Sequence, residues 1–206
     1  MQAVKACPDC TRFSPIKKPA VIQPIIAAAP FQRLVIDLVT LKDYHTDNKG
    51  YKYILTVIDA FTQYVWAFPQ KSKKATEVSC HLLNLFNTWK PCLELQSDNG
   101  KEFTADVIKA LCHLGHVKII HGAPYKPSTQ SRIERFNQTL QRELAKAVNQ
   151  SVKKTWIDKV DAITHSYNRT FHASIKMSPF TAMTGLHAEP TQYLQMKHIS
   201  KPQTHI

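Results

Sequence analysis

The stretch LQSDNGKEFTADVIKAL, residues 95–111, passes from a strand through a turn into a helix. The sequence CLELQ, residues 92–96, reads as a strand, and it stops at Asp-Asn-Gly, a common turn sequence. Val107, Leu111 and Leu114 then recur at helical spacing. The short strand pattern VKIIHG follows, so a helix bridges two strands, as is typical of an α/β fold.

The segments on either side extend this pattern. Upstream, three strand patterns at residues 31–41, 51–61 and 64–70 are separated by turn sequences, which predicts antiparallel pairing. A helical pattern occupies residues 73–90, with apolar positions Val78, Leu82, Leu85, Phe86 and Trp89. Downstream, one face of a long helix is marked by Ile133, Phe136, Leu140, Leu144, Ala147 and Val148, and a further helix is predicted from Trp156 to about Phe171. We therefore expect an α/β sheet with mixed strand directions.

The domain organisation follows from length and composition. A chain of 206 residues is long enough for one good-sized core. Residues 1–30 carry five prolines and no sustained period, which predicts an amino-terminal arm. The predicted core domain occupies residues 31–190, and residues 191–206 form a carboxy-terminal tail with little periodicity.

The charge balance favours a polyanionic partner. Lys and Arg number 27 against 15 Asp and Glu, a formal net charge of +12, and nucleic acid is the first candidate. No apolar run is long enough to span a membrane and no signal-peptide pattern opens the chain, so we expect a soluble intracellular protein without a membrane partner. The five cysteines are odd in number and mostly scattered, which indicates a reducing compartment.

Four carboxylates are candidates for chemistry. Asp37 and Asp59 each interrupt an apolar strand pattern, where a carboxylate is costly unless it is paired, hydrogen-bonded or bound to metal, and periodicity does not choose between them. Asp98 lies where a strand gives way to a turn, so a turn role is its alternative. Glu134 follows Asp98 after 134 − 98 − 1 = 35 residues, but chance produces about one such pair, and Ser131 with Glu134 also matches a helix capping box.

The blocks around these residues are more specific than their spacing. RLVIDLV, LQSDNGKEFTADVIKAL and IIHGAPYKPSTQSRIERFNQTLQREL occur in the order found in integrases of retroviruses and gypsy-type retrotransposons, and the chain resembles their catalytic core from about Phe31 to Pro190. The resemblance implies an RNase H-like fold, a mixed five-stranded sheet flanked by helices. It also implies a catalytic and metal-binding triad of Asp37, Asp98 and Glu134, with Asp59 at a structural position.

The function that the resemblance implies is that of a metal-dependent DNA strand transferase and endonuclease. Two Mg²⁺ or Mn²⁺ ions suit carboxylate ligands and would assist 3′-end processing and strand transfer of DNA. The alternative is a catalytically silent, domesticated integrase fold that acts as a DNA- or protein-binding module. An RNase H-like nuclease acting on RNA–DNA hybrids is a third reading, against which the Ile-Glu-Arg-Phe-Asn block argues.

The expected partners are donor and target DNA, held mainly by phosphate contacts. Candidate contacts are Lys126 in the loop before the long helix and Arg132, Arg135 and Arg142 on it, each with a solvated surface charge as its alternative. The resemblance also implies a homodimer or higher oligomer through the core and a nuclear location. Ser131 stands where the family usually has glycine, in the loop that leads to this helix.

Other metal-ligating residues have simpler interpretations. Cys7 and Cys10 form half of a tetrahedral zinc site, so Zn²⁺ would bind only if the other half is present. Cys112, His113, His116 and His121 are close in sequence, but their spacing fits no common zinc motif and we expect surface or partly buried side chains. Asn168, His172 and Ser178 match a family pattern that packing and helix capping explain.

Overall fold

The computed structural model describes residues 27–41, 48–98, 100–121, 127–150 and 155–187. Its centre is one five-stranded sheet in the order β3-β2-β1-β4-β5. The strands are β1 (Arg33–Thr40), β2 (Tyr53–Asp59), β3 (Val65–Gln70), β4 (Glu94–Ser97) and β5 (Lys118–His121). Strands β1, β2 and β3 pair antiparallel, whereas β4 runs parallel to β1 and β5 parallel to β4. The predicted mixed sheet is therefore confirmed.

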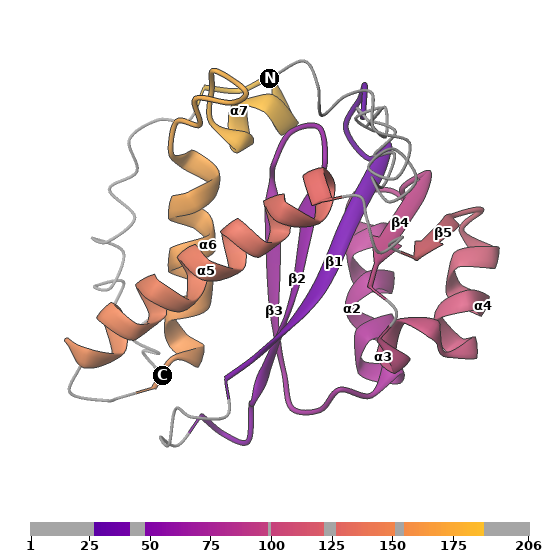
Figure 1. Cartoon of the computed structure of the whole chain (residues 1–206), viewed down its shortest axis with the longest axis horizontal. Helices are drawn as coiled ribbons and strands as arrows, with labels where there is room; N and C mark the ends of the chain where they lie inside the picture. Colours follow the sequence, from indigo (N-terminus) through magenta and orange to yellow (C-terminus); the bar gives the residue numbers. More distant parts are fainter. Residues whose placement is uncertain (1–26, 42–47, 99, 122–126, 151–154, 188–206) are drawn as a thin grey trace, which may run out of the picture.

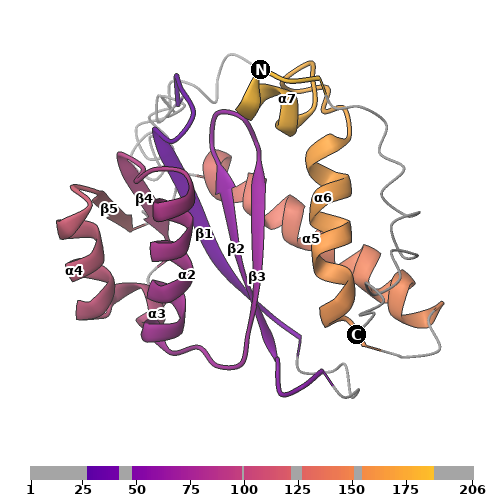
Figure 2. The same ribbon diagram turned by 180° about the vertical axis from the view of Figure 1, so that it is seen from behind.

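Helices cover both faces of this sheet (Figures 1 and 2). One face packs against α2 (Ala75–Thr88) and α4 (Asp106–Leu114), with the short α3 (Lys101–Thr104) between β4 and α4. The other face packs against α5 (Pro127–Asn149) and α6 (Val160–Arg169). The 3₁₀ turn η2 (Ile157–Lys159) precedes α6, and α7 (Pro179–Thr184) follows it.

The alternation of side chains along β1 decides where Asp37 points. Leu34 and Ile36 belong to the core beneath α2, whereas Val35 and Val39 belong to the core beneath α5. Because successive strand residues face opposite sides of a sheet, Asp37 shares the side of Val35 and Val39. The strand therefore presents this carboxylate to α5.

The long helix begins earlier than the sequence pattern suggests. It starts at Pro127, so Ser131 lies inside the helix and is not its N-cap residue. The prediction of a loop at Ser131 and the capping-box interpretation of Ser131 with Glu134 are both wrong. Proline is favoured in the first turn, where its missing N–H costs nothing. The hydroxyl of Ser131 instead accepts a 3.2 Å hydrogen bond from Arg135 Nη2.

Two further expectations concern regions at the ends of the chain. The predicted arm and tail lie largely outside the described residues, as do Cys7 and Cys10. Between residues 27 and 187, no helix that the structure describes is long and apolar enough to cross a membrane.

Candidate active site

Asp37 is a half-buried carboxylate held by two donors. The backbone N–H of Leu38 donates to its Oδ1 at 2.7 Å, and Asn137 Nδ2 donates to its Oδ2 at 2.8 Å. Asn137 is buried on α5, 100 positions along the chain from Asp37. The sheet and the long helix are thus joined at the carboxylate of Asp37.

Asp98 is brought to the same place by the pairing of β1 with β4. In this parallel register Arg33 faces Glu94, an offset of 94 − 33 = 61 residues. The same offset continued past the end of β4 places Asp98 opposite Asp37, since 98 − 37 = 61. Asp98 is exposed, and its Oδ1 accepts a hydrogen bond from the Gly100 N–H at 2.9 Å.

Gly100, in the turn after Asp98, leaves room for two neighbouring carboxylates. A Cβ at Gly100 would lie 3.0 Å from Asp98 Oδ1 and 3.0 Å from the Glu102 carboxylate. Real Cβ atoms rarely make contacts this close, so a larger residue would displace one of the two carboxylates. The predicted turn therefore also sets the position of the Asp98 side chain.

Glu134 is supplied by the first half of α5. Ile133 and Phe136 on either side of it are buried against the sheet, whereas Glu134 is exposed. Asn137, three residues further on, lies about one helical turn away and contacts Asp37. The packing of α5 therefore brings Glu134 into the neighbourhood of β1 while leaving its side chain exposed.

The charges of Asp98 and Glu134 both act on the carboxyl group of Asp37. Burial raises the pKa of Asp37 most, and the Leu38 N–H opposes this increase. Negative charge on Asp98 raises the pKa further, as does that on Glu134, while the Asn137 amide lowers it. Like charges this close destabilise one another unless cations or protons compensate them.

The donor set suits a hard divalent cation, but the ligands are not gathered into one group. Carboxylate oxygens are what Mg²⁺ and Mn²⁺ prefer. Within the described ranges, however, no three His, Cys, Asp or Glu side chains lie close enough to hold a metal ion together. An ion bound here would therefore need Asp98 or Glu134 to turn toward Asp37, and both are exposed.

Asp59, the other buried strand carboxylate, is a structural anchor. It accepts hydrogen bonds from the N–H groups of Phe31, Phe61 and Thr62 at 2.7, 3.1 and 2.7 Å. The Thr62 hydroxyl donates a fourth at 2.8 Å. These bonds tie the β2–β3 turn to the start of β1, which agrees with a structural position for Asp59.

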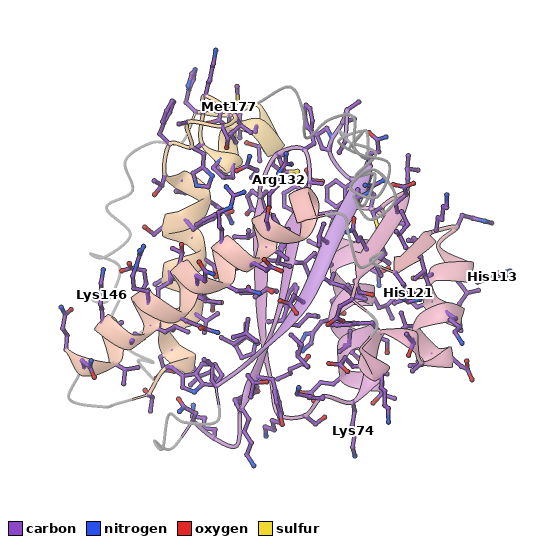
Figure 3. All side chains as sticks on the ribbon, viewed as in Figure 1. Lys74, His113, His121, Arg132, Lys146 and Met177 are labelled. Atoms are coloured by element: carbon purple, nitrogen blue, oxygen red, sulfur yellow. The ribbon has the colours of Figure 1, made fainter. Side chains whose placement is uncertain are left out.

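The basic residues predicted to contact DNA have different surroundings. Arg132 donates to the backbone oxygen of Ala60 and so helps to hold α5 against the β2–β3 turn (Figure 3). Arg135 donates to the backbone oxygen of Ser131 at 3.1 Å, and Arg142 pairs with Glu143 at 3.2 Å. Both side chains are exposed, whereas Lys126 lies outside the described residues.

The remaining sequence motifs are explained by packing. Ser178 caps α7, where its hydroxyl accepts from the Thr181 N–H at 3.1 Å. Asn168 accepts from the Val65 N–H at 2.9 Å and donates to the Val65 oxygen at 2.8 Å. Cys112 is buried in the core beneath α2, whereas His113 projects from the outer side of α4 (Figure 3).

Asn137 is the residue of the site that we did not predict. It completes the block Ile-Glu-Arg-Phe-Asn, in which it stands three positions after Glu134. That spacing puts both side chains on neighbouring turns of one helix face, which was the available signal. Its Oδ1 atom is buried without a hydrogen-bond partner among the described residues, so the amide is committed to Asp37 through its nitrogen.

The fold and the site define a class of protein. A mixed sheet of this order, covered by helices on both faces and carrying acidic residues on β1, after β4 and on α5, has the RNase H-like fold of integrase catalytic cores. Two family models, both described as integrase core domain, match residues 27–127 and 115–179. The chain belongs to the family of retroviral and gypsy-type integrase catalytic cores.

The sequence relatives are much longer proteins. The chain is 23% identical over 188 residues to the Pro-Pol polyprotein of simian foamy virus type 3, which covers 90% of this chain and 16% of the polyprotein. It is 27% identical over 165 residues to the Transposon Tf2-3 polyprotein of Schizosaccharomyces pombe, covering 77% of this chain and 12% of that protein. The chain therefore spans a small part of these relatives.

Solved structures share the fold at low sequence identity. A chain in the structure of the simian T-cell lymphotropic virus intasome in complex with PP2A regulatory subunit B56 gamma matches 80% of this chain and 58% of that chain, with a TM-score of 0.68 at 17% identity. The HTLV-2 integrase catalytic core in complex with magnesium matches 76% of this chain and 99% of that chain, with a TM-score of 0.64 at 16% identity. The BIV core matches 72% and 91%, with a TM-score of 0.60 at 23% identity.

Proposed function

We propose that this chain is the catalytic core of an integrase-type polynucleotidyl transferase that processes DNA 3′ ends and transfers them into target DNA. The observation that carries the proposal is the convergence of three elements at Asp37: the parallel register of β1 with β4 directs Asp98 toward it, and Asn137, three residues after Glu134 on α5, donates to its Oδ2 at 2.8 Å. Negative charge on Asp98 and Glu134 raises the pKa of Asp37, so a bound cation would favour the ionised carboxylates. Membership of the integrase core family gives this arrangement its chemical interpretation.

The chemistry is displacement at phosphorus by an oxygen nucleophile. In the first step a water oxygen forms the new bond to phosphorus, and the 3′ oxygen of the cleaved strand leaves. In the second step that 3′ hydroxyl attacks target DNA, another 3′ oxygen leaves, and one phosphodiester replaces another. Two Mg²⁺ or Mn²⁺ ions, when bound, would activate the attacking oxygen and stabilise the leaving oxygen.

Each residue of the site has a defined task in this proposal. Asp37, Asp98 and Glu134 would hold the ions through their carboxylates. Asn137 holds the Asp37 carboxylate in place through the 2.8 Å bond to Oδ2. No side chain forms a covalent bond to DNA, because water and the DNA hydroxyl supply the nucleophiles.

The proposed partners are donor and target DNA, bound through phosphates. The described candidates are Arg132, Arg135 and Arg142, all of which are exposed, and Lys126 remains a candidate outside the described residues. Self-association through the core is also proposed, because the HTLV-2 core is named in dimeric and trimeric forms. A nuclear location is proposed because the proposed substrate is DNA.

A disintegration-type assay on branched DNA, which follows the reversal of strand transfer, tests this function. Glu134→Gln removes the carboxylate charge that a metal ligand needs, so activity with Mg²⁺ or Mn²⁺ should fall at least about a hundredfold, an effect of roughly 3 kcal/mol or more on the barrier. The matched control is Glu143→Gln on the same helix, which should keep nearly full activity because Glu143 pairs only with neighbouring basic side chains. Equal activity of wild type and Glu134→Gln would refute the assignment.

The second candidate is a non-catalytic integrase fold that binds DNA or protein. The observation that favours it is that the described acidic side chains do not form a three-ligand group. This candidate expects no thermal stabilisation by Mg²⁺ or Mn²⁺ and no reaction with either ion. A rise in melting temperature with Mg²⁺ in wild type, absent in Glu134→Gln, would exclude it.

A further inference from the structure

A group of lysines is gathered at the end of the sheet where β1 finishes, β2 begins and β3 finishes. Between Asn48 and Ala75 the sequence has five lysines but one acid, Asp59, which lies at the opposite end of β2. All five lysines are exposed, and four of them lie with two half-buried tyrosines. We call this group the lysine end, and it consists of Lys52, Lys71, Lys73 and Lys74 with Tyr51 and Tyr53.

The strand pairing and one turn bring these residues together. Tyr53 pairs with Gln70, and the Lys52 N–H donates to the Gln70 oxygen at 3.1 Å, so the start of β2 meets the end of β3. The turn after β3 is closed by Glu77, which accepts from the Lys71 N–H at 2.8 Å and the Ser72 N–H at 3.0 Å. The lysine side chains therefore project from an ordered backbone.

The lysines and the tyrosines contact one another. Lys71 Nζ lies 5.2 Å from the ring centroid of Tyr51, and Lys73 Nζ lies 5.5 Å from that of Tyr53. Aromatic faces attract ammonium groups and hold them near one position. In Figure 3 the Lys74 side chain extends away from the molecule at this end. The result is a preorganised patch of positive charge that faces solvent.

The lysine end adjoins the site formed by Asp37, Asp98 and Glu134, which we call the acidic site, along β1. Thr40, the last residue of β1, pairs with Tyr53. Thr40 lies three positions after Asp37, about 10 Å along a strand, which is the rise of roughly three base pairs of B-DNA. Tyr51 also packs against the core beneath α5, the side of the sheet to which Asp37 points. A duplex that lay on the acidic site and ran along β1 would therefore reach the lysine end within one helical turn.

We propose that the lysine end binds the phosphate backbone of duplex DNA whose reacting phosphodiester lies at Asp37, Asp98 and Glu134. This inference rests on the proposed function and adds a contact surface on β2, β3 and the turn before α2. Lysine ammonium groups suit phosphate as point charges, without reading the bases. The surface sets the direction in which DNA leaves the acidic site, and its contribution to binding depends on salt.

Two charge-matched triple variants test the proposal in the full chain. Lys71→Gln/Lys73→Gln/Lys74→Gln removes three charges from the lysine end, and Lys109→Gln/Lys118→Gln/Lys176→Gln removes three exposed charges elsewhere. Each lowers the formal net charge from +12 to 12 − 3 = +9. Affinity for a short blunt duplex is measured by fluorescence anisotropy between about 50 and 200 mM salt.

The expected result is a difference between the two triples. The lysine-end triple should bind about tenfold more weakly, and its slope of log affinity against log salt should fall by about 2 to 3, because each lost phosphate contact removes about 0.9. The control triple should change the slope by less than about 1. Equal losses in both triples would overturn the proposal, since net charge alone would then explain binding. Weaker binding to phosphatidylserine vesicles with unchanged DNA binding would also overturn it.

A second measurement needs no variant. Lysine acetylation of the wild-type chain, read residue by residue by mass spectrometry, should be slowed by the duplex at Lys71, Lys73 and Lys74 but not at Lys109. Equal protection at all four would contradict the inference. The disintegration assay distinguishes failure of this inference from failure of the proposed function. A wild type that is active but shows no protection at the lysine end refutes only the lysine-end surface. A wild type that neither binds nor reacts with DNA refutes the proposed function.

Discussion

At the scale of single residues, Asn137 connects the sheet and the long helix through one amide. Its Nδ2 donates to Asp37 Oδ2 at 2.8 Å, and its buried Oδ1 has no partner among the described atoms. Groups that orient a metal ligand commonly change metal affinity 10- to 100-fold when they are removed. We assign Asn137 as a positioning residue that acts through Asp37.

Asn137→Ala should therefore lower the melting temperature and also weaken the thermal stabilisation of the chain by Mg²⁺. We expect the Mg²⁺ concentration for half-maximal thermal stabilisation to rise about tenfold. The matched control is Asn168→Ala, which removes a buried amide that bonds Val65 far from the acidic site. It should lower the melting temperature without moving the Mg²⁺ dependence. A purely structural Asn137 would behave like Asn168.

The cysteines differ sharply in predicted reactivity. Burial raises the pKa of Cys92 to about 12 and that of Cys112 to about 11, and both side chains are almost fully buried. Cys80 is exposed. Because the thiolate is the reactive form, iodoacetamide should label Cys80 in the folded chain and label the other two only in denaturant. Peptide mass spectrometry reads this directly, and early labelling of Cys92 would contradict the burial of its thiol.

At the scale of elements, the turn between β2 and β3 depends on Asp59. Its carboxylate accepts four hydrogen bonds, three of them from backbone N–H groups. Asp59→Ala leaves those donors buried without partners and should cost on the order of 3 kcal/mol of unfolding free energy. Urea denaturation measures this cost.

The control for Asp59 is an exposed carboxylate in a surface ion pair. Asp106 bonds Lys109 at 2.9 Å with its side chain 97% exposed, so Asp106→Ala should change stability by less than about 1 kcal/mol. A comparable loss in both variants would show that the β2–β3 turn does not depend on its buried acceptor.

The observed helices and strands also show which elements the sequence patterns predict and which they miss. Apolar patterns predict the first three strands. The alternation of side chains along β1 implies which face of the sheet carries Asp37. The start of α5 was mispredicted, because Ser131 and Glu134 imitate a helix cap while the helix begins at Pro127. The helical pattern after Asp98 is broken at Ala105, whose extended backbone (ψ 152°) separates α3 from α4. Neither detail follows from the spacing of apolar residues.

At the scale of the whole molecule, the acidic site is made by long-range packing. The family blocks identify Asp37, Asp98 and Glu134 as candidates, yet each lies on a different element. How close these three side chains come to one another depends on the parallel register of β1 and β4, an offset of 61 residues, and on the packing of α5 against the sheet. Both are tertiary properties that local patterns do not contain, which is also why the contact of Asn137 with Asp37 was not foreseen.

Three histidines contribute to the stability of the whole molecule against acid. Burial lowers the pKa of His81, His165 and His172 below their ordinary value of 6.5. The unfolded chain therefore takes up protons first as the pH falls, so unfolding is favoured. Full stability from these groups is present above about pH 6.5 and declines as the pH falls through 6.5 toward their folded-state pKa values.

Thermal melting between about pH 7.5 and 5.5 tests this, and the melting temperature should fall by several degrees on acidification. Glu77 does not account for a fall in this range, because burial raises its pKa but hydrogen bonds from Lys71 and Ser72 lower it below 4.5 overall. His81 stacks on Phe68 at 5.1 Å, so His81→Phe keeps an aromatic ring there but cannot take up a proton. Its decline with pH should be shallower than that of wild type, whereas His113→Gln on the outer side of α4 should match wild type. A curve for His81→Phe that coincides with wild type would exclude His81 from the acid response.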